Sequence, residues 1–186
     1  MTNITVTLDE IEKQTTSALT GHGATLWIAQ EVAKAVKLAE AEDNKVCGLY
    51  YLESYCKQLD SGRVDGQIDP EITLPKSGCV FVDAKYGFAQ AAFSVGIDSA
   101  IESVKKNGIC LFAIAHSHTC TSLGYFTSQI AKRGFLGIGT TNAPACVSPP
   151  NGNKPILGTN PISMSVPSAD KNIAFQFDQS TSAIAI

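Results

Sequence analysis

The sequence predicts an α/β protein in which a mostly helical N-terminal segment precedes an α/β sheet domain that is incomplete at its C-terminus. Before residue 60 apolar residues recur at helical spacing, whereas from Cys79 onward short continuous apolar runs alternate with helical stretches. The composition agrees, since 44% apolar and 17% charged residues suit a buried sheet flanked by helices. We place the domain boundary between residues 1–77, the helical segment with its connector, and residues 78–186.

Three helices are expected in the N-terminal segment. Thr7 and Glu10 form a capping box, which begins the first helix. A longer helix is expected over 24–42, because its apolar residues keep helical spacing, and a third is expected over 48–59, ending at Asp60-Ser61-Gly62. We interpret 62–78, which contains two prolines, as an irregular connection.

The C-terminal domain is expected to alternate strands and helices. The predicted strands are 79–83, 109–115, 135–141, 162–166 and 173–177, and the predicted helices are 86–107 and 121–133. The order strand–helix–strand–helix–strand implies right-handed parallel crossovers within one sheet. The second and third strands are continuous apolar runs, as expected of strands buried on both faces.

Charge and cysteine usage exclude several classes of protein. The net charge is -3, and the basic residues form no cluster larger than a pair such as Lys105-Lys106, which gives no reason to expect nucleic acid or an acidic membrane as partner. Six cysteines without a CxxC pattern indicate free thiols in a reducing compartment. Without a signal peptide or a run of membrane-spanning length, the expected protein is soluble and cytoplasmic.

The segment after the predicted strand 109–115 carries the candidate chemistry. In an extended chain His116, His118 and Cys120 project to one side, which is a possible metal site. Zinc needs three or four ligands, however, and no further ligand has motif spacing. A metal-binding α/β protein is therefore only a weak functional hypothesis, the third beside the two stated below, and our prediction is no metal.

The turn 119–124 leads from a strand end into a helix start. Unsatisfied backbone N–H groups and the helix dipole favour an anion such as a phosphate there. The alternative is an ordinary helix cap, with Thr121 or Ser122 as the cap residue. These residues leave both interpretations open, and no GxGxxG fingerprint, P-loop, GxSxG elbow or EF-hand loop decides between functions.

Several short segments of the chain form a recognisable set of motifs: Val82-Asp83-Ala84, Gly87-Phe88-Ala89-Gln90, Ser117-His118, Ala131-Lys132-Arg133-Gly134, Thr141-Asn142, Leu157-Gly158-Thr159-Asn160-Pro161-Ile162 and Phe177-Asp178-Gln179-Ser180-Thr181-Ser182. Through these motifs, roughly residues 25–186 resemble the malate/L-lactate dehydrogenase family, which is sulfolactate-dehydrogenase-like and includes ureidoglycolate dehydrogenase and delta-1-piperideine-2-carboxylate reductase. The resemblance implies a non-Rossmann domain that binds NAD or NADP, a small-molecule substrate and a homodimer. Family members reduce 2-oxo acids or cyclic imino acids, or catalyse the reverse oxidation.

The resemblance also assigns site residues by position. The residues implied to contact the cofactor are Thr119, Cys120, Thr121, Ser122, Leu123, Asp178, Gln179 and Ser180. Thr159 is implied to contribute a hydroxyl to the substrate or nicotinamide pocket, and His118 is the candidate catalytic acid.

Three positions depart from the family pattern. Family members carry Ser-His-Gly and then Arg in the first helical segment, which supply the proton, its relay and a carboxylate clamp. Here Val46 and Cys47 precede the glycine, and Tyr51 stands where the arginine is expected. The first hypothesis is therefore an NAD(P)-dependent oxidoreductase of altered substrate class. The second is a truncated, degenerate relative that at most binds nucleotide or pairs with a full-length subunit.

The sequence stops at Ile184-Ala185-Ile186, where the pattern indicates an uncapped apolar helix. Such a helix face has nothing in the chain to bury against. We therefore expect either a truncated product or a partner that covers this open C-terminal surface.

Overall fold

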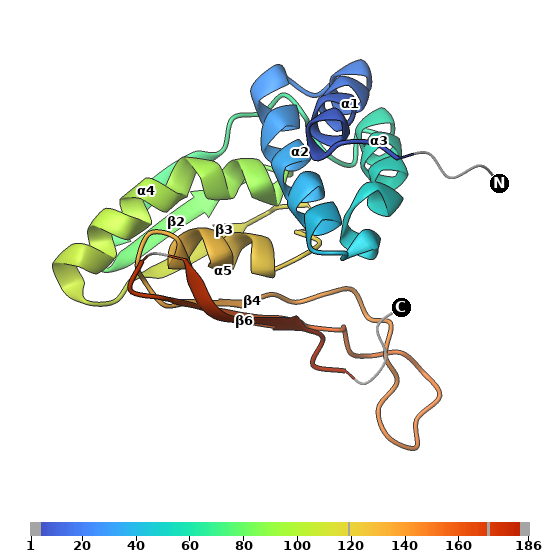
Figure 1. The fold of residues 1–186 in the computed structure, drawn as a ribbon. Coiled ribbons are helices and arrows are strands. Elements are labelled where there is room, and N and C mark those ends of the chain that lie inside the picture. The colour runs from blue at the N-terminus through green and yellow to red at the C-terminus, as the bar shows by residue number, and fades with distance from the viewer. Residues whose placement is uncertain (1–4, 119, 171, 183–186) are drawn as a thin grey trace. The chain divides into compact units, whose positions relative to one another are not determined.

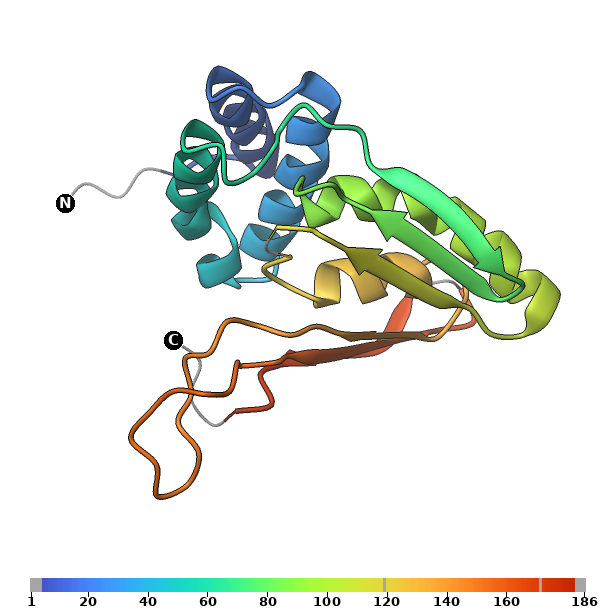
Figure 2. The ribbon, with the colours of Figure 1, turned by 180° about the vertical axis from the view of Figure 1, so that it is seen from behind.

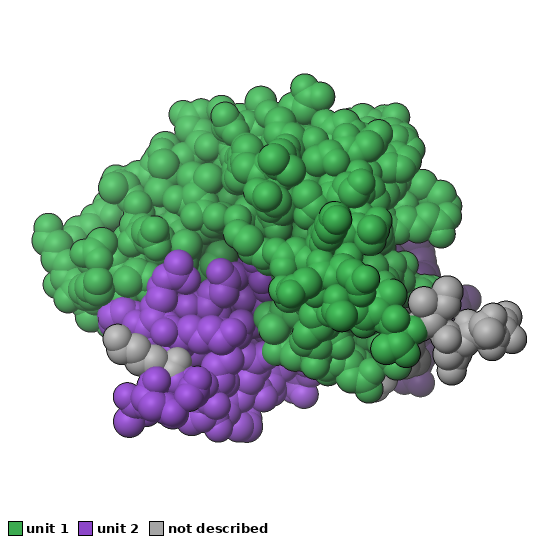
Figure 3. All heavy atoms as spheres, turned by 45° about the horizontal axis from the view of Figure 1, so that its top comes forward, with its two compact units in different colours: residues 1–121 green, residues 122–186 purple. Residues whose placement is uncertain are grey.

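The computed structural model describes residues 5–118, 120–170 and 172–182, and Figures 1 and 2 show its ribbon from two sides. The chain forms two compact units, residues 1–121 and 122–186, which Figure 3 colours separately. The division between units differs from the predicted boundary at 77/78. It differs because Phe88 and Ala91, which follow the predicted boundary, share one core cluster with the N-terminal helices.

The first unit begins with three α-helices, as predicted: α1 (Leu8–Gly21), α2 (Leu26–Ala41) and α3 (Leu52–Asp60). Two 3₁₀ turns, η1 (Lys45–Cys47) and η2 (Leu49–Tyr51), precede α3, so the predicted third helix starts later than expected. The capping box is confirmed, since the Glu10 backbone N–H donates to Thr7 Oγ1 and the Thr7 N–H donates to the Glu10 carboxylate.

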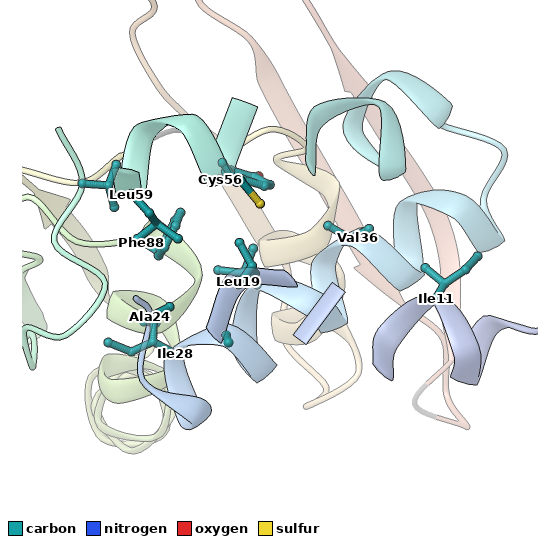
Figure 4. Packing of buried hydrophobic residues seen from close by; sticks show 13 residues of the cluster. Ile11, Leu19, Ala24, Ile28, Val36, Cys56, Leu59 and Phe88 are labelled. Carbon is teal, nitrogen blue, oxygen red and sulfur yellow. The ribbon is translucent and has the colours of Figure 1, made fainter. Parts of the chain in front are cut away.

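Buried side chains of α1, α2, α3 and α4 form the main core of the first unit (Figure 4). Leu19, Ile28 and Tyr55 are at most 1% exposed. The Tyr55 ring packs edge-on against Phe88, with centroids 5.6 Å apart. Each large apolar side chain buried in this way contributes about 1.5–3 kcal/mol. The buried residues of this core are largely those whose helical spacing is visible in the sequence, so the sequence pattern identifies the core.

A three-stranded sheet completes the first unit, in the order β1 (Glu71–Lys76), β2 (Cys79–Asp83) and β3 (Leu111–Ala115) (Figure 2). β2 and β3 are parallel, as predicted, whereas β1 is antiparallel to β2. The prediction of an irregular connection over 62–78 is wrong, because this segment contains β1. Pro75 is tolerated there because β1 is an edge strand with an irregular register after Thr73.

Helix α4 (Ala89–Asn107) packs on one face of this sheet. Its Ala92 and Ala100 contact the cluster of Val80 and Val82. Gly108 ends the helix in the left-handed region, at a φ of 78°. The helix begins at residue 89 rather than at the predicted 86.

The second unit contains α5 (Gly124–Ala131) and an antiparallel sheet of β4 (Gly137–Thr140), β5 (Ile162–Pro167) and β6 (Ile173–Gln179). The prediction of one sheet with further parallel crossovers is wrong here. A parallel connection requires a crossover, usually a helix. The connection 141–161 contains no helix, only an isolated bridge between Val147 and Leu157, and it projects from the sheet before returning antiparallel (Figure 1).

Neither strand that the sequence predicts to be buried on both faces is buried in this way. Leu111 in β3 is 64% exposed and Ile138 in β4 is 61% exposed. Within each unit a helix covers one sheet face: α4 covers the first sheet and α5 the second. On the covered face of the second sheet, Thr127 bonds to Ser163 and Ser165, at 2.8 Å each.

All six cysteines are free thiols, as predicted, and Cys56 is buried while the others are half-buried. Among the described residues, none of the helices combines the length and the apolar character that crossing a bilayer requires.

Candidate functional site

His118 lies just after β3, where the chain continues the parallel pairing of β2 and β3. The backbone N–H of His118 donates to the Gly87 carbonyl at 2.8 Å, and the backbone carbonyl of His118 accepts from the Ala89 N–H at 3.3 Å. The ring centroid lies 6.5 Å from that of Tyr55 and 6.3 Å from that of Phe88. Its Nε2 is buried without a hydrogen-bond partner among the described residues. The backbone therefore holds the imidazole in an apolar, aromatic environment.

This environment determines the charge of His118. Burial, and secondarily the nearby Arg63, lower the pKa of His118 to about 4. The ring is therefore neutral at neutral pH. A neutral imidazole can form one hydrogen bond through Nε2, but it is a weak source of protons, which argues for a hydrogen-bonding role at this position.

A polar network lies beside His118 in the same unit. The Tyr55 hydroxyl donates to Thr121 Oγ1 at 3.3 Å, and Gln90 Nε2 donates to Tyr55 Oη at 3.5 Å and to the Cys120 carbonyl at 3.4 Å. The Thr121 hydroxyl donates to the same carbonyl at 2.7 Å. Burial raises the pKa of Tyr55 well above its usual range, so the phenol stays neutral.

Gln90 is the most informative member of this network. The residue is fully buried, at 0% exposed, yet its Oε1 has no hydrogen-bond partner among the described residues. Buried polar atoms are nearly always paired, so an unpaired atom needs an explanation such as a missing ligand. Gln90 Oε1 and His118 Nε2 are two such atoms around one tyrosine, Tyr55.

The three departures from the family pattern lie on and beside the 3₁₀ turns. Val46 is 66% exposed, and Cys47 is half-buried. The Tyr51 ring packs edge-on against Tyr55 with centroids 5.1 Å apart, so this residue contacts the network. None of these side chains carries the permanent charge needed to clamp a carboxylate.

The turn 119–124 spans both units, with Cys120 and Thr121 in the first and Ser122 and Leu123 in the second. The N-cap residue of α5 is Leu123, so the alternative in which Thr121 or Ser122 is the cap residue does not hold. The carboxylate of Asp178 accepts hydrogen bonds from Ser122 Oγ at 3.0 Å and from the Gly124 N–H at 2.8 Å. The helix start thus does hold an anion, and this anion is a side chain of β6.

The segment around Thr159 is held by backbone contacts. Its carbonyl accepts from the hydroxyls of Ser180 and Thr181, at 3.1 Å each. At Gly158 a Cβ would lie 2.2 Å from the Ala143 carbonyl oxygen, so only glycine fits. Asn160 Oδ1 accepts from the Ala143 N–H at 2.9 Å. This motif therefore fixes the ends of the long connection 141–161.

The predicted alignment of three metal-ligating side chains is wrong. His116 has a φ of 49°, which interrupts the extended geometry. Its Nδ1 lies 3.0 Å from Asp83 Oδ1, while His118 faces Tyr55 and Phe88. In the described part of the chain, no group of three or more His, Cys, Asp or Glu residues is placed to hold a metal ion. Thr119, another predicted cofactor contact, lies outside the described residues.

A family model described as malate/L-lactate dehydrogenase matches residues 6–186. The chain belongs to this family of oxidoreductases. It is 32% identical over 185 residues to Delta(1)-pyrroline-2-carboxylate reductase 1 of Burkholderia ambifaria, with 100% of this chain and 54% of that protein covered. It is 31% identical over 162 residues to (2R)-3-sulfolactate dehydrogenase (NADP(+)) of Chromohalobacter salexigens, with 87% and 48% covered.

A solved structure of the malate/L-lactate dehydrogenase family has the same fold. The delta1-piperideine-2-carboxylate reductase from Pseudomonas syringae pvar. tomato superimposes with a TM-score of 0.93 at 29% identity, with 98% of this chain and 55% of that chain covered. The predicted family and fold class are confirmed. The chain spans about half the length of the relatives that it matches.

Two residues of the polar network, Tyr55 and Gln90, are not among the site residues predicted from the sequence. Gln90 belongs to the Gly87-Phe88-Ala89-Gln90 motif, but the sequence does not reveal that one of its polar atoms is unpaired. Tyr55 occupies an apolar helix position, which predicts a core residue and conceals its hydroxyl. A buried glutamine within an apolar helix face is the signal that could have located the network.

Proposed function

We propose that this chain acts in an NAD(P)-dependent oxidoreductase that interconverts a cyclic imino acid, or a 2-oxo acid, with its reduced form. The observation that carries the proposal is the unpaired Gln90 Oε1 beside Tyr55 and His118. Preference for cyclic imino acids follows from the similarity to reductases named for such substrates. Since the chain spans about half of these relatives, the activity of the whole protein is part of this proposal.

The residues present fit a nicotinamide coenzyme. A buried amide oxygen without a partner suits an N–H donor, such as the carboxamide of nicotinamide. By family position, the residues that would hold the coenzyme are Cys120, Thr121, Ser122, Leu123, Gln179 and Ser180, together with Thr119. Asp178 would support this turn as the cap of α5. When bound, the coenzyme supplies or accepts the hydride.

The chain's own groups would bind and orient the substrate. Neutral His118 and the neutral phenol of Tyr55 offer hydrogen bonds without the cost of burying a charge. Thr159, by family position, would contribute to the substrate or nicotinamide pocket. We also propose that the chain works as a homodimer in the cytoplasm, a reducing compartment that suits its free thiols.

A second candidate function is a non-catalytic relative that binds nucleotide or pairs with a full-length subunit. The observation that favours it is the exposed Val46 beside Cys47 and Tyr51, where family members carry Ser, His and Arg. Loss of a general acid alone reduces rates by roughly 10²–10⁴.

Coenzyme titration and turnover assays separate the two functions. NADH and NADPH are titrated by fluorescence, and turnover is assayed on Δ1-pyrroline-2-carboxylate, Δ1-piperideine-2-carboxylate and a set of 2-oxo acids. Binding with turnover supports the oxidoreductase, binding without turnover supports the second candidate, and absence of both refutes nucleotide binding.

A variant pair tests the role of the network. Gln90→Leu should weaken coenzyme binding, while Gln67→Leu should leave it unchanged, since the Gln67 side chain donates to the Gly23 carbonyl outside the network. Equal coenzyme affinity in both variants would show that the unpaired Gln90 Oε1 does not contact the coenzyme, and the proposal would lose its main support.

A further inference from the structure

The carboxyl edge of the parallel pair β2–β3 carries a second group of polar side chains. Asp83 is the last residue of β2, and its register partner Ala115 is the last residue of β3, so His116 follows directly at the same edge. In parallel α/β sheets, ligands usually bind beyond the carboxyl ends of the strands. From the sequence, His116 is only a possible metal ligand, and Asp83 is not among the predicted site residues.

The side chains at this edge hold one another in place through hydrogen bonds and a ring contact. Asp83 Oδ1 accepts from the Lys85 N–H at 2.8 Å and lies 3.0 Å from His116 Nδ1. The Tyr86 ring lies against the imidazole, with centroids 5.6 Å apart and planes tilted by 34°. Lys85 Nζ is itself paired with Glu71 at 2.9 Å. The carboxylate therefore orients the imidazole through Nδ1 and leaves Nε2 for another partner.

Both rings are accessible. The side chain of His116 is 55% exposed, and Tyr86 is 68% exposed. Among the described residues, none bonds to His116 Nε2. An exposed tyrosine face beside an oriented imidazole offers a flat surface for a planar ring and a titratable nitrogen next to it.

The backbone at this edge is held in an uncommon conformation. Lys85, Tyr86 and His116 are all left-handed, with φ of 48°, 65° and 49°, although none is glycine. The Tyr86 N–H donates to the His116 carbonyl at 2.7 Å, which couples the two segments. Such residues persist where the surroundings hold them, and they concentrate at ligand sites.

We propose that His116, positioned by Asp83, is an acid–base residue of a ligand site at this edge, where Tyr86 stacks on the planar ring of the substrate. The proposal rests on the proposed function and deepens it, because it supplies the proton that neutral His118 lacks. In the reduction, His116 would act as an imidazolium that donates Nδ1–H to Asp83 and transfers its Nε2 proton to the imine nitrogen or carbonyl oxygen. A bound coenzyme would supply the hydride that forms a C–H bond at the adjacent carbon as the C=N or C=O π bond breaks, and His116 would then regain a proton from water.

The charge of the positioning residue agrees with this role. The Lys85 backbone N–H, and secondarily His116, hold the pKa of Asp83 below its usual range. Asp83 is therefore a carboxylate at neutral pH and accepts a hydrogen bond from an imidazole N–H. The charged and titratable groups that face His116 are Asp83, Lys85 and Tyr86, with Glu71 behind Lys85.

A binding experiment tests the site without turnover. The chain has three histidines, so their Cε1–H resonances are readily assigned by NMR. His22 is an internal control, because its Nδ1 lies 2.7 Å from Asp60 in an exposed pair that is not at a sheet edge. Pyrrole-2-carboxylate, a planar carboxylate that hydride does not reduce, is the probe. We expect it to shift the His116 resonance and to leave His22 in place.

Variants test the proton transfer. His116→Asn suits the left-handed backbone, since asparagine tolerates it, and it should lower kcat by roughly 10²-fold or more with coenzyme affinity unchanged. Asp83→Asn should lower kcat by less with little change in KM, and Asp83→Glu should restore part of the loss. His22→Asn is the matched control and should leave kcat unchanged.

The outcomes separate this proposal from the proposed function. Turnover that His116→Asn retains, or a bound probe that leaves the His116 resonance unmoved, overturns the role of His116 and leaves the oxidoreductase standing. A shifted His116 resonance without turnover supports the ligand site and overturns the proposed reduction. A chain that binds neither probe nor coenzyme overturns both.

Discussion

His118 couples packing to protonation, because its ring lies within 6.5 Å of two aromatic centroids, and burial lowers its pKa from 6.5 to about 4. Between these pH values the unfolded chain binds more protons than the folded chain. The free energy of unfolding should therefore fall as the pH decreases from 6.5 to 4. Denaturant titrations at several pH values measure this slope.

The variant His118→Gln tests the assignment of that slope. It removes the titrating group, so this part of the pH dependence should disappear. His22→Gln retains His118 and should keep it. An unchanged slope in His118→Gln would mean that His118 is not buried in its neutral form.

Asp178 acts at the start of α5, where its carboxylate accepts from Ser122 Oγ and the Gly124 N–H. Asp178→Ala removes a helix cap and should cost about 0.5–2 kcal/mol in the free energy of unfolding. Asp178→Asn keeps an acceptor but loses the favourable charge, so about 0.3–1 kcal/mol is expected. Chemical denaturation measures both, with exposed Asp69→Ala as control. A loss in the control as large as that in Asp178→Ala would contradict the capping role.

The sequence identifies some of the candidate site and not the rest, for reasons that are physical. His118 and the turn 119–124 stand out because their residue types and spacing are unusual. The unpaired Gln90 Oε1 and the positioning of His116 by Asp83 depend on side chains far apart in the sequence. No local pattern encodes such contacts.

At the scale of elements, Gly96 determines how closely α4 approaches the first sheet. A Cβ at this position would lie 2.6 Å from two ring atoms of Phe112 and 2.7 Å from Val82 Cγ2. Gly96→Ala should destabilise the chain by roughly 1–3 kcal/mol through overpacking, more than the gain of about 1 kcal/mol from helix propensity.

Gly21→Ala is the matched control, since a Cβ there meets nothing within 4 Å. Thermal and denaturant unfolding of both variants should show a loss for Gly96→Ala alone. If Gly96→Ala were as stable as Gly21→Ala, the helix would not be in close contact with the sheet.

Elements with local signals are predicted well, and strand pairing is not. The capping box at Thr7 and the glycine after α4 lie in the sequence next to the helices that they delimit. The antiparallel pairing of β5 with β4 depends on how the connection 141–161 returns to the sheet. The Pro, Asn and Gly residues of this connection do not specify that direction. For the same reason β1 escapes prediction, since its pairing partner β2 rather than its own composition makes it a strand.

At the scale of the whole molecule, the two units differ in how much apolar surface they bury internally. Residues 1–121 contain the main core and the β1–β3 sheet with α4. In residues 122–186, α5 covers one sheet face, and the register places Ile138, Met164 and Phe177 together on the other. On that second face Ile138 is 61% exposed and Phe175 53% exposed.

A fragment of residues 1–121 should therefore unfold cooperatively on its own, whereas 122–186 should not. Small domains bury too little surface to offset their conformational entropy, and an uncovered sheet face worsens that balance. Circular dichroism during urea titration of each fragment measures the difference. A cooperative transition in 122–186 alone would show that the contacts of Thr127 in α5 with Ser163 and Ser165 in β5 suffice to stabilise this unit, and the exposed face would then have no part in its stability.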